Sequence, residues 1–237
     1  GDQKTAYVDE VCKQMLYRSK KIPLDTIFNI KFNNGVLING EFVEIDDYKE
    51  FTPYYVELDY KPEAEPVEIV DNYVAQLTNN DEKYRDLLFE ILAHGLITDP
   101  EVKRSLAKFF IFVGDGGNGK GTLLSIIRSI LNRENCSGLK IKQMSDERYA
   151  YSLDGKLVNL GDDIQDQPIN GKDMEMLKNI STCDYVEIRK MFKNSTSATM
   201  TTSLIFTSNH ILKSWEKGES YKRRVLWLPM YSKPKRK

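Results

Sequence analysis

Residues 108–131 read KFFIFVGDGGNGKGTLLSIIRSIL, and this stretch sets our expectation for the rest of the chain. The run FFIFV predicts a buried strand, and the apolar residues that recur at helical spacing after Gly121 predict a helix. Between them, Gly114, four further residues, Gly119 and Lys120 nearly match a phosphate-binding loop. That pattern continues with Ser or Thr, whereas this chain has Gly121 and then Thr122.

The loop suits phosphate for three physical reasons. Glycines let backbone N–H groups turn toward an anion, the start of a helix carries partial positive charge, and Lys120 adds a full charge for the β- and γ-phosphates. We therefore expect ATP to contact ten residues: Gly114, Asp115, Gly116, Gly117, Asn118, Gly119, Lys120, Gly121, Thr122 and Leu123. A glycine-rich turn without a ligand is the alternative, and the flanking strand and helix argue against it.

The loop alone does not fix the ligands of the Mg²⁺ ion that accompanies ATP. Gly121 has no side chain for a metal, and Thr122 carries the nearest hydroxyl, which could act directly, through water or not at all. Further on, GKLVNLGDDI predicts a strand that ends in Asp162 and Asp163. We expect Asp162 to hold Mg²⁺ through water and Asp163 to polarise the attacking water as a base. An acidic loop cap is the alternative.

Two more apolar runs carry polar residues at one end. SLIFTSNH, residues 203–210, predicts a buried strand followed by Asn209, which we expect to reach the γ-phosphate or the attacking water. We interpret His210 as an ordinary loop residue. YKRRVLWLPM places Arg223 and Arg224 before a final strand. Either could be an arginine finger toward a neighbouring subunit, or both could be surface charge.

The composition is typical of a soluble globular protein, with 41% hydrophobic and 29% charged residues among 237. No apolar run approaches the roughly 20 residues of a membrane span, and no signal segment is visible, so we expect a cytoplasmic protein without a membrane partner. The three cysteines show no metal-ligand spacing. A net charge of −1 argues against a general basic coat, so any DNA contact must come from a local patch.

We expect three parts along the chain: a helix and hairpin region over 1–66, a helical segment over 67–100, and an ATPase core over 101–237. Apolar spacing predicts an amphipathic helix over 1–22, and Asn34-Gly35 and Asn39-Gly40 mark hairpin turns. Two helices are expected to break near Asn79-Asn80, and Asp99-Pro100 is expected to form a turn before the core.

The order of these motifs resembles the helicase domain of phage- and plasmid-encoded primase-helicases, which belong to helicase superfamily 3 within the AAA+ ATPases. The likeness covers most of residues 25–230. It implies an α/β fold with an AAA+-like P-loop core and a central parallel sheet, preceded by a smaller, mostly helical region with short hairpins. It also implies a hexameric ring around DNA, ATP sites between subunits, and 3′→5′ translocation.

The resemblance assigns roles to single residues. The matches are Lys120 to the Walker A lysine, Asp162 and Asp163 to the Walker B acids, Asn209 to the motif C sensor, and Arg223 or Arg224 to the trans arginine. The chain departs from the pattern at Gly121, which replaces a hydroxyl residue. It departs again at Asp163, where many AAA+ ATPases have a Glu that is longer by one methylene.

The family also places a DNA-contacting hairpin between the Walker B and motif C strands, where this chain has DYVEIRKMFKNSTSATMTTSLIF. Strand alternation predicts that Val186, Ile188 and Phe192 share one apolar side. Lys190 falls on the same side, so its side chain would have to turn away to solvent near the strand end. The stretch NSTSATMTT is expected to be a flexible tip. The residues expected to contact DNA are Arg189, Lys190, Lys193 and Asn194. An ordinary hairpin with solvated lysines is the alternative.

Together these patterns favour an ATP-dependent DNA helicase of a phage, plasmid or mobile-element replication protein, acting in the cytoplasm of a bacterial host. Lys-Gly-Thr also resembles the loop of adenylate kinases, so a nucleoside monophosphate kinase is one alternative. The lack of a recognisable nucleotide-acceptor segment weakens it. A nucleotide-gated DNA-loading module without unwinding is another, and the Asp162-Asp163 pair argues against it.

Overall fold

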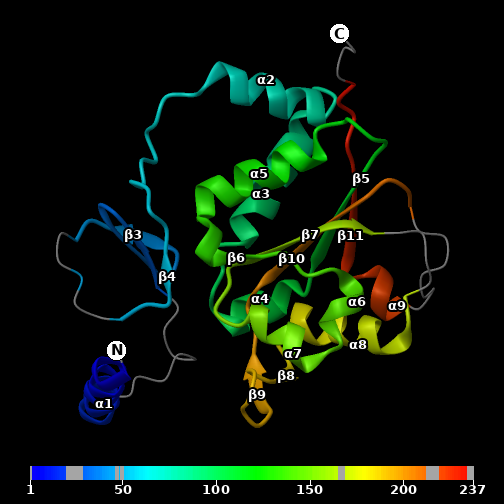
Figure 1. Ribbon diagram of the computed structural model, residues 1–237. Coiled ribbons are helices and arrows are strands. Elements are labelled where there is room, and N and C mark those ends of the chain that lie inside the picture. Colours follow the sequence, from blue (N-terminus) through cyan, green and yellow to red (C-terminus); the bar gives the residue numbers. More distant parts are fainter. Residues whose placement is uncertain are drawn as a thin grey trace.

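The computed structural model describes residues 2–19, 29–45, 48, 51–164, 169–211 and 219–233, without the side chains of 2–5, 163, 219 and 220. Its centre is a five-stranded sheet of order β11-β5-β10-β7-β6, in which all neighbours run parallel (Figure 1). The strands are β5 (Phe109–Val113), β6 (Cys136–Ser137), β7 (Val158–Ile164), β10 (Ser203–Ser208) and β11 (Val225–Pro229). The predicted α/β fold with a central parallel sheet is therefore confirmed.

Side-chain alternation along β5 divides the core into two layers, because successive residues of a strand point to opposite faces. Phe110 and Phe112 pack into one hydrophobic cluster, and Phe109 and Ile111 pack into the other. The first face is covered by α2 (Glu68–Leu77), α3 (Glu82–His94) and α5 (Lys120–Leu131). The second is covered by α6 (Ile141–Met144), α7 (Glu147–Ala150), α8 (Gly171–Ser181) and α9 (Glu219–Lys222). Figure 1 shows these layers on either side of the sheet.

Aspartate caps determine where α3 and α4 (Pro100–Leu106) begin. Asp81 accepts a hydrogen bond from the Tyr84 N–H at 3.1 Å, just after the predicted break between two helices. Asp99 accepts from the Glu101 N–H at 2.8 Å, and Pro100 occupies the first turn of α4. The expectation of a simple turn at Asp99-Pro100 is therefore wrong: Asp is a favourable N-cap, and Pro fits the first helical position.

A second sheet of order β3-β2-β1-β4 precedes the core. Its strands are β1 (Ile30–Phe32), β2 (Gly35–Ile38), β3 (Glu41–Val43) and β4 (Tyr54–Tyr55). The predicted hairpins are present, although the first turn lies at Asn33–Asn34 because Gly35 already pairs with Phe32. The Asn135 side-chain amide donates to the Tyr55 carbonyl at 2.6 Å and so joins this sheet to the 3₁₀ turn after α5, Arg133–Asn135.

The first helix, α1 (Asp2–Arg18), is present as predicted, but its described side chains are all exposed. Val8, Met15 and Leu16 are each more than half exposed, so the apolar face of α1 is open to solvent within the described part of the chain. A second 3₁₀ turn, Tyr151–Leu153, follows α7. None of the described helices is long and apolar enough to cross a bilayer.

Candidate functional site

The glycine-rich stretch forms a tight turn between β5 and α5. Gly117 and Gly119 have φ angles of 79° and 90°, in the left-handed region that favours glycine. A Cβ atom on Gly114 would lie 1.7 Å from the Asn118 side-chain nitrogen, so a larger residue does not fit there. Gly119 is the N-cap of α5, and the turn therefore leads directly into the positive end of a 12-residue helix.

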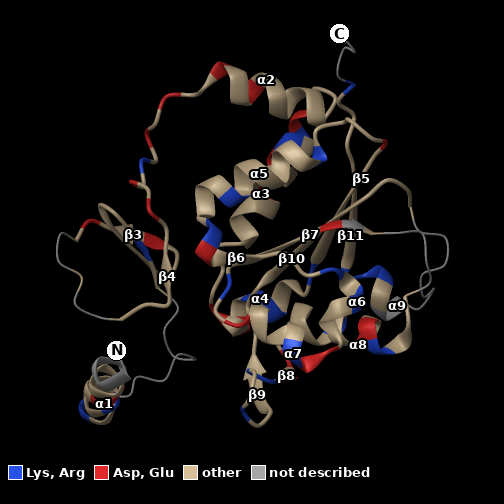
Figure 2. Cartoon of the chain, viewed as in Figure 1, with Lys and Arg blue, Asp and Glu red and all other residues tan. Residues whose placement is uncertain are grey.

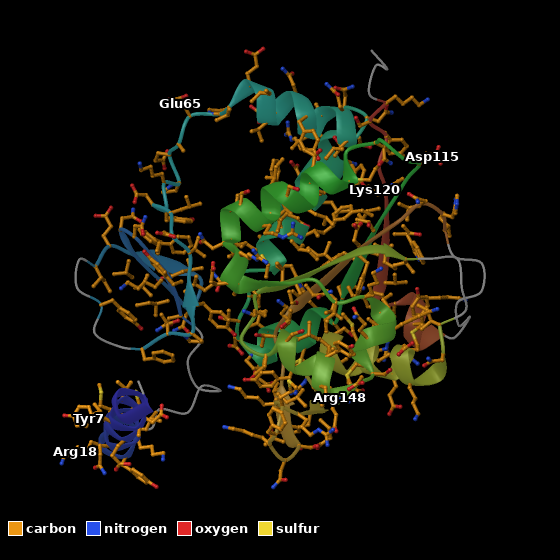
Figure 3. All side chains as sticks on the ribbon, in the orientation of Figure 1. Tyr7, Arg18, Glu65, Asp115, Lys120 and Arg148 are labelled. Carbon is orange, nitrogen blue, oxygen red and sulfur yellow. The ribbon has the colours of Figure 1, made fainter. Side chains whose placement is uncertain are left out.

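The Lys120 side chain ties this loop to the strand ends. Its Nζ donates to the carbonyls of Gly114 and Asp115, the latter at 3.1 Å, and lies 3.2 Å from Oδ1 of both Asn118 and Asn209. Figure 3 shows Lys120 at the start of α5, on the side of the sheet away from Arg148. The ammonium is thus surrounded by oxygens that a bound anion could replace.

Asp162 and Asn209 reach the same region because their strands are neighbours. β10 lies between β5 and β7, Asn209 directly follows β10, and Asp162 lies near the end of β7. The Thr207 hydroxyl donates to the Asp162 carboxylate at 3.1 Å and joins the two strands. The backbone of Asp163 belongs to β7, but its side chain lies outside the described part of the structure. The structure therefore brings together Lys120, Asp162 and Asn209.

A cavity of about 670 Å³ opens over the loop. Its lining residues are Tyr73, Gly116, Gly117, Asn118, Gly119, Lys120, Gly121, Thr122, Asp162, Thr207, Asn209 and Ser232. Of the ten predicted loop residues, Gly114 and Asp115 do not line it, and their carbonyls hold Lys120 instead. Leu123 is 2% exposed and packs into the core, where it supports α5.

Three lining residues are not predicted from the sequence: Tyr73, Thr207 and Ser232. Thr207 belongs to the same Thr-Ser-Asn run as Asn209, so its place at a strand end offered a local signal. Tyr73 lies on α2, and its hydroxyl donates to the Gly119 carbonyl at 2.9 Å across 46 residues of sequence. Burial raises the pKa of Tyr73 to about 12. Its position depends on how α2 packs, and no local pattern reports that.

Arg223 and Arg224 lie at the opposite ends of the strands from the glycine-rich loop. They precede β11, whose first residue pairs with the first residue of β5. The loop leaves the far end of this five-residue strand, roughly 15 Å away at the usual rise of a strand. Together with Arg104 and Lys108 they line a separate basic hollow of about 400 Å³. The structure therefore does not bring these arginines to the cavity of their own chain.

The predicted hairpin is present as β8 (Tyr185–Ile188) and β9 (Thr196–Thr199), which pair antiparallel. Val186 and Ile188 are buried on one side, as expected. Phe192 does not share that side, because β8 ends at Ile188 and Phe192 stands 99% exposed in the turn, at a φ of 61°. The stretch NSTSATMTT is not the tip either, since part of it forms β9. The turn instead spans residues 189–195.

The four residues expected to contact DNA fall into two pairs. Arg189 Nε lies 3.1 Å from a carboxylate oxygen of Glu147 on α7, and Lys190 Nζ lies 5.7 Å from the centre of the Tyr151 ring. The Lys190 side chain is thus exposed, with its ammonium over this ring, and is not buried on the apolar side of the hairpin. Lys193 and Asn194 are exposed on the turn. Two of the four predicted residues therefore support the hairpin, and two remain open to a partner.

Fold and site together define an α/β protein with a phosphate-loop-like turn on a parallel sheet. Residues 112–224, just under half of the chain, match the model of a family of unknown function (DUF5906). No curated protein sequence matches the chain significantly.

Two apo structures of the C-terminal region of NrS-1 are similar to this chain. One is 19% identical with a TM-score of 0.61, over 94% of this chain and 52% of that one. The other, of residues 305–718, is 23% identical with a TM-score of 0.58, over 72% of this chain and 40% of that one. This chain thus spans about half the length of these structures or less, and at such identities the likeness shows a shared fold.

Proposed function

We propose that this chain is the ATPase core of a DNA helicase from a phage, plasmid or mobile-element replication protein. The observation that carries the proposal is the gathering of Lys120, Asp162 and Asn209 around one cavity on the glycine-rich loop. The motif order, which resembles that of superfamily 3 helicases, supports the same function. So does the fold shared with the NrS-1 C-terminal region.

In this proposal the residues of the chain act on a triphosphate. Lys120 exchanges loop oxygens for β- and γ-phosphate oxygens, and Asn209, 3.2 Å from Lys120, binds the γ-phosphate or orients the attacking water. Asp163 accepts the proton of that water. The donor set fits Mg²⁺, because the Thr122 hydroxyl and the Asp162 carboxylate both line the cavity and are hard oxygen ligands. Bound there, the ion would neutralise phosphate charge.

The same proposal assigns DNA to the β8–β9 turn and ATP to the interface between subunits. Six turns in a ring would concentrate Lys193 and Asn194 around a strand of DNA, which reconciles DNA binding with a net charge of −1. The basic residues of the hairpin can be followed in Figure 2. Arg223 or Arg224 would serve the γ-phosphate of an adjacent subunit.

Hydrolysis of ATP by the purified chain, with and without single-stranded DNA, tests the proposal. We expect DNA-stimulated hydrolysis in the wild type and loss of both nucleotide affinity and hydrolysis in Lys120→Ala, because this ammonium is the cation held over the loop. Phosphate transfer to AMP would favour a monophosphate kinase instead. Binding of ATP and DNA without hydrolysis would favour a loading module. A wild-type protein that does not bind ATP contradicts the proposal.

A further inference from the structure

The lining of the cavity falls into two chemical groups. Lys120, Asp162 and Asn209 suit phosphate and metal, whereas Tyr73, from α2, offers an aromatic ring. Tyr73 is the only aromatic residue among the described residues that line this cavity. A flat, apolar part of a ligand therefore finds one stacking surface next to the loop.

Tyr73 is held as a fixed platform. Its hydroxyl donates to the Gly119 carbonyl at 2.9 Å, and a Cβ atom at position 119 would lie 3.3 Å from the edge of its ring. The ring thus lies directly against the phosphate loop. The Tyr73 hydroxyl is protonated at neutral pH and so remains a donor, and burial raises its pKa further, to about 12. A side chain that is already ordered loses little entropy when a ligand stacks on it.

A second hollow adjoins this ring on α2. It has a volume of about 360 Å³ and is lined by Glu68, Ile69, Asn72, Tyr73 and Gln76. The amides and the carboxylate offer both donors and acceptors, and Ile69, 77% exposed, adds apolar surface. The Glu68 charge disfavours phosphate here. This hollow therefore complements a flat ring with a polar edge.

We propose that this face of α2 is a nucleobase site. The base of a nucleoside triphosphate stacks on Tyr73, its edge bonds to the polar groups of α2, and its phosphates lie on the loop that Tyr73 contacts. Figure 1 shows α2 on the same side of the sheet as α5, the helix that directly follows the loop. The inference rests on the proposed nucleotide function and adds the residues that hold the base.

Two substitutions separate the aromatic face from the hydroxyl. Tyr73→Phe and Tyr73→Leu both remove the bond to Gly119, but only Phe retains a stacking surface. We expect the Leu variant to bind ATP about tenfold more weakly than the Phe variant, as base–aromatic stacking predicts. Both should bind inorganic tripolyphosphate equally, because it has no base. Titration calorimetry measures all four dissociation constants, and Tyr149→Ala, which removes an exposed tyrosine from α7, is the control.

The outcomes distinguish the base site from the nucleotide function itself. Equal ATP affinity of the Phe and Leu variants would overturn the base site and leave the proposed function standing. So would a Leu variant that loses tripolyphosphate and ATP in the same proportion, because Tyr73 would then only support the loop. A wild-type protein that binds neither ligand would overturn both proposals.

Discussion

At the scale of single residues, Gly121 leaves open space where most phosphate loops carry a hydroxyl. A Cβ atom at this position would meet no heavy atom within 4 Å. Gly121→Ser should therefore fold, and it should place a hydroxyl beside Thr122 on the first turn of α5. We expect it to lower the Mg²⁺ concentration needed for half-maximal ATP binding, measured by fluorescence titration, while the matched Gly121→Ala variant leaves it unchanged. Identical Mg²⁺ requirements in both variants would show that a metal does not reach this turn.

His94, Lys103 and Ser203 form a buried polar cluster that joins α3, α4 and β10. Lys103 Nζ donates to the His94 carbonyl at 2.8 Å and to the Ser203 hydroxyl oxygen at 2.7 Å, and His94 Nδ1 lies 2.7 Å from the same oxygen. Burial, aided by the Lys103 charge, lowers the pKa of His94 to about 3. Burial also lowers the pKa of Lys103 to about 7. Both groups therefore bind protons more weakly in the folded protein than in the unfolded chain.

The second prediction is that His94 makes the folded protein sensitive to acid. Between its unfolded pKa of 6.5 and its folded pKa of about 3, the unfolded chain holds the extra proton, so the free energy of unfolding falls as the pH falls. The contribution is about 1.4 kcal/mol per pH unit. Urea unfolding at pH 7.5 and pH 5 should show a smaller loss in His94→Gln than in the wild type.

His210→Gln is the matched control, because it replaces the one other histidine and lies exposed after β10. It should retain the wild-type loss between the two pH values. An equal loss in His94→Gln and in the wild type would mean that the ring of His94 titrates normally in the folded protein. Lys103 acts in the same direction over a higher range, from its folded pKa of about 7 up to 10.5, so it overlaps the measured interval only at its upper end and is present in the wild type and in both variants.

Single residues differ in how well the sequence predicts their place. Asp162 and Asn209 end or follow an apolar run, Lys120 closes the glycine-rich motif after another, and a parallel sheet gathers such positions at the same ends of its strands, so the local pattern was sufficient. Tyr73 sits on an ordinary amphipathic helix, and nothing in its surroundings along the chain sets it apart from twelve other tyrosines. Only the packing of α2 against the loop gives it a place in the cavity.

At the scale of elements, the β8–β9 hairpin yields the third prediction. Lys193 is exposed in a turn whose base is fixed by Arg189 and Glu147. Lys193→Ala should weaken single-stranded DNA binding severalfold and leave ATP hydrolysis without DNA in place. Because a lysine that neutralises a phosphate releases counterions, the slope of log affinity against log salt should become shallower by about 0.7 for each phosphate that the variant no longer neutralises. Fluorescence anisotropy at several salt concentrations measures this slope.

Lys83→Ala is the matched control for the hairpin, since Lys83 is exposed on α3, which packs on the other face of the sheet. It should leave both the affinity and the slope unchanged. If Lys193→Ala behaves like this control, the lysine is solvated surface charge and the hairpin has no role in DNA binding.

Elements with a strong period were predictable, and those set by a turn were not. The buried strands and the helices α2, α3 and α5 follow from apolar spacing alone. The hairpin turn was misplaced because Phe192 continues the apolar alternation of β8 in the sequence, yet the strand ends at Ile188. Similarly, α4 was missed because an Asp-Pro pair starts a helix as readily as it forms a turn.

At the scale of the whole molecule, the position of β11 decides how the arginines can act. The sequence predicts a final strand after Arg224 but not its neighbour, and strand order is a tertiary property. In the structure β11 runs parallel to β5, and the first residues of the two strands pair with each other. Arg223 and Arg224 therefore lie at the N-terminal ends of these strands, whereas the glycine-rich loop leaves the C-terminal end of β5. Within one chain the cavity over the glycine-rich loop is therefore lined by Lys120 but by neither of these arginines.

Under the proposed function, a triphosphate cleaved in this cavity would develop charge that an arginine would stabilise. If a neighbouring subunit supplies it, Arg223→Ala or Arg224→Ala should lower turnover by about 10³- to 10⁵-fold while each subunit still binds ATP. Arg223 is exposed and Arg224 is half-buried, so the two are tested separately. Arg85→Ala, which removes an exposed arginine from α3, should retain wild-type turnover.

The fourth prediction is that two inactive variants restore each other. An Arg223→Ala or Arg224→Ala subunit keeps an intact Lys120, and a Lys120→Ala subunit keeps both arginines, so a mixed assembly contains interfaces with one complete set. We expect the mixture to recover part of the wild-type hydrolysis rate, in proportion to the fraction of such interfaces, as measured by phosphate release at increasing ratios of the two proteins. Dilution should abolish the recovered activity, because the complete site exists only between subunits. Activity that does not recover at any ratio, together with a wild-type rate per subunit that is independent of protein concentration, would mean that each chain completes its site alone and that the arginines serve another purpose.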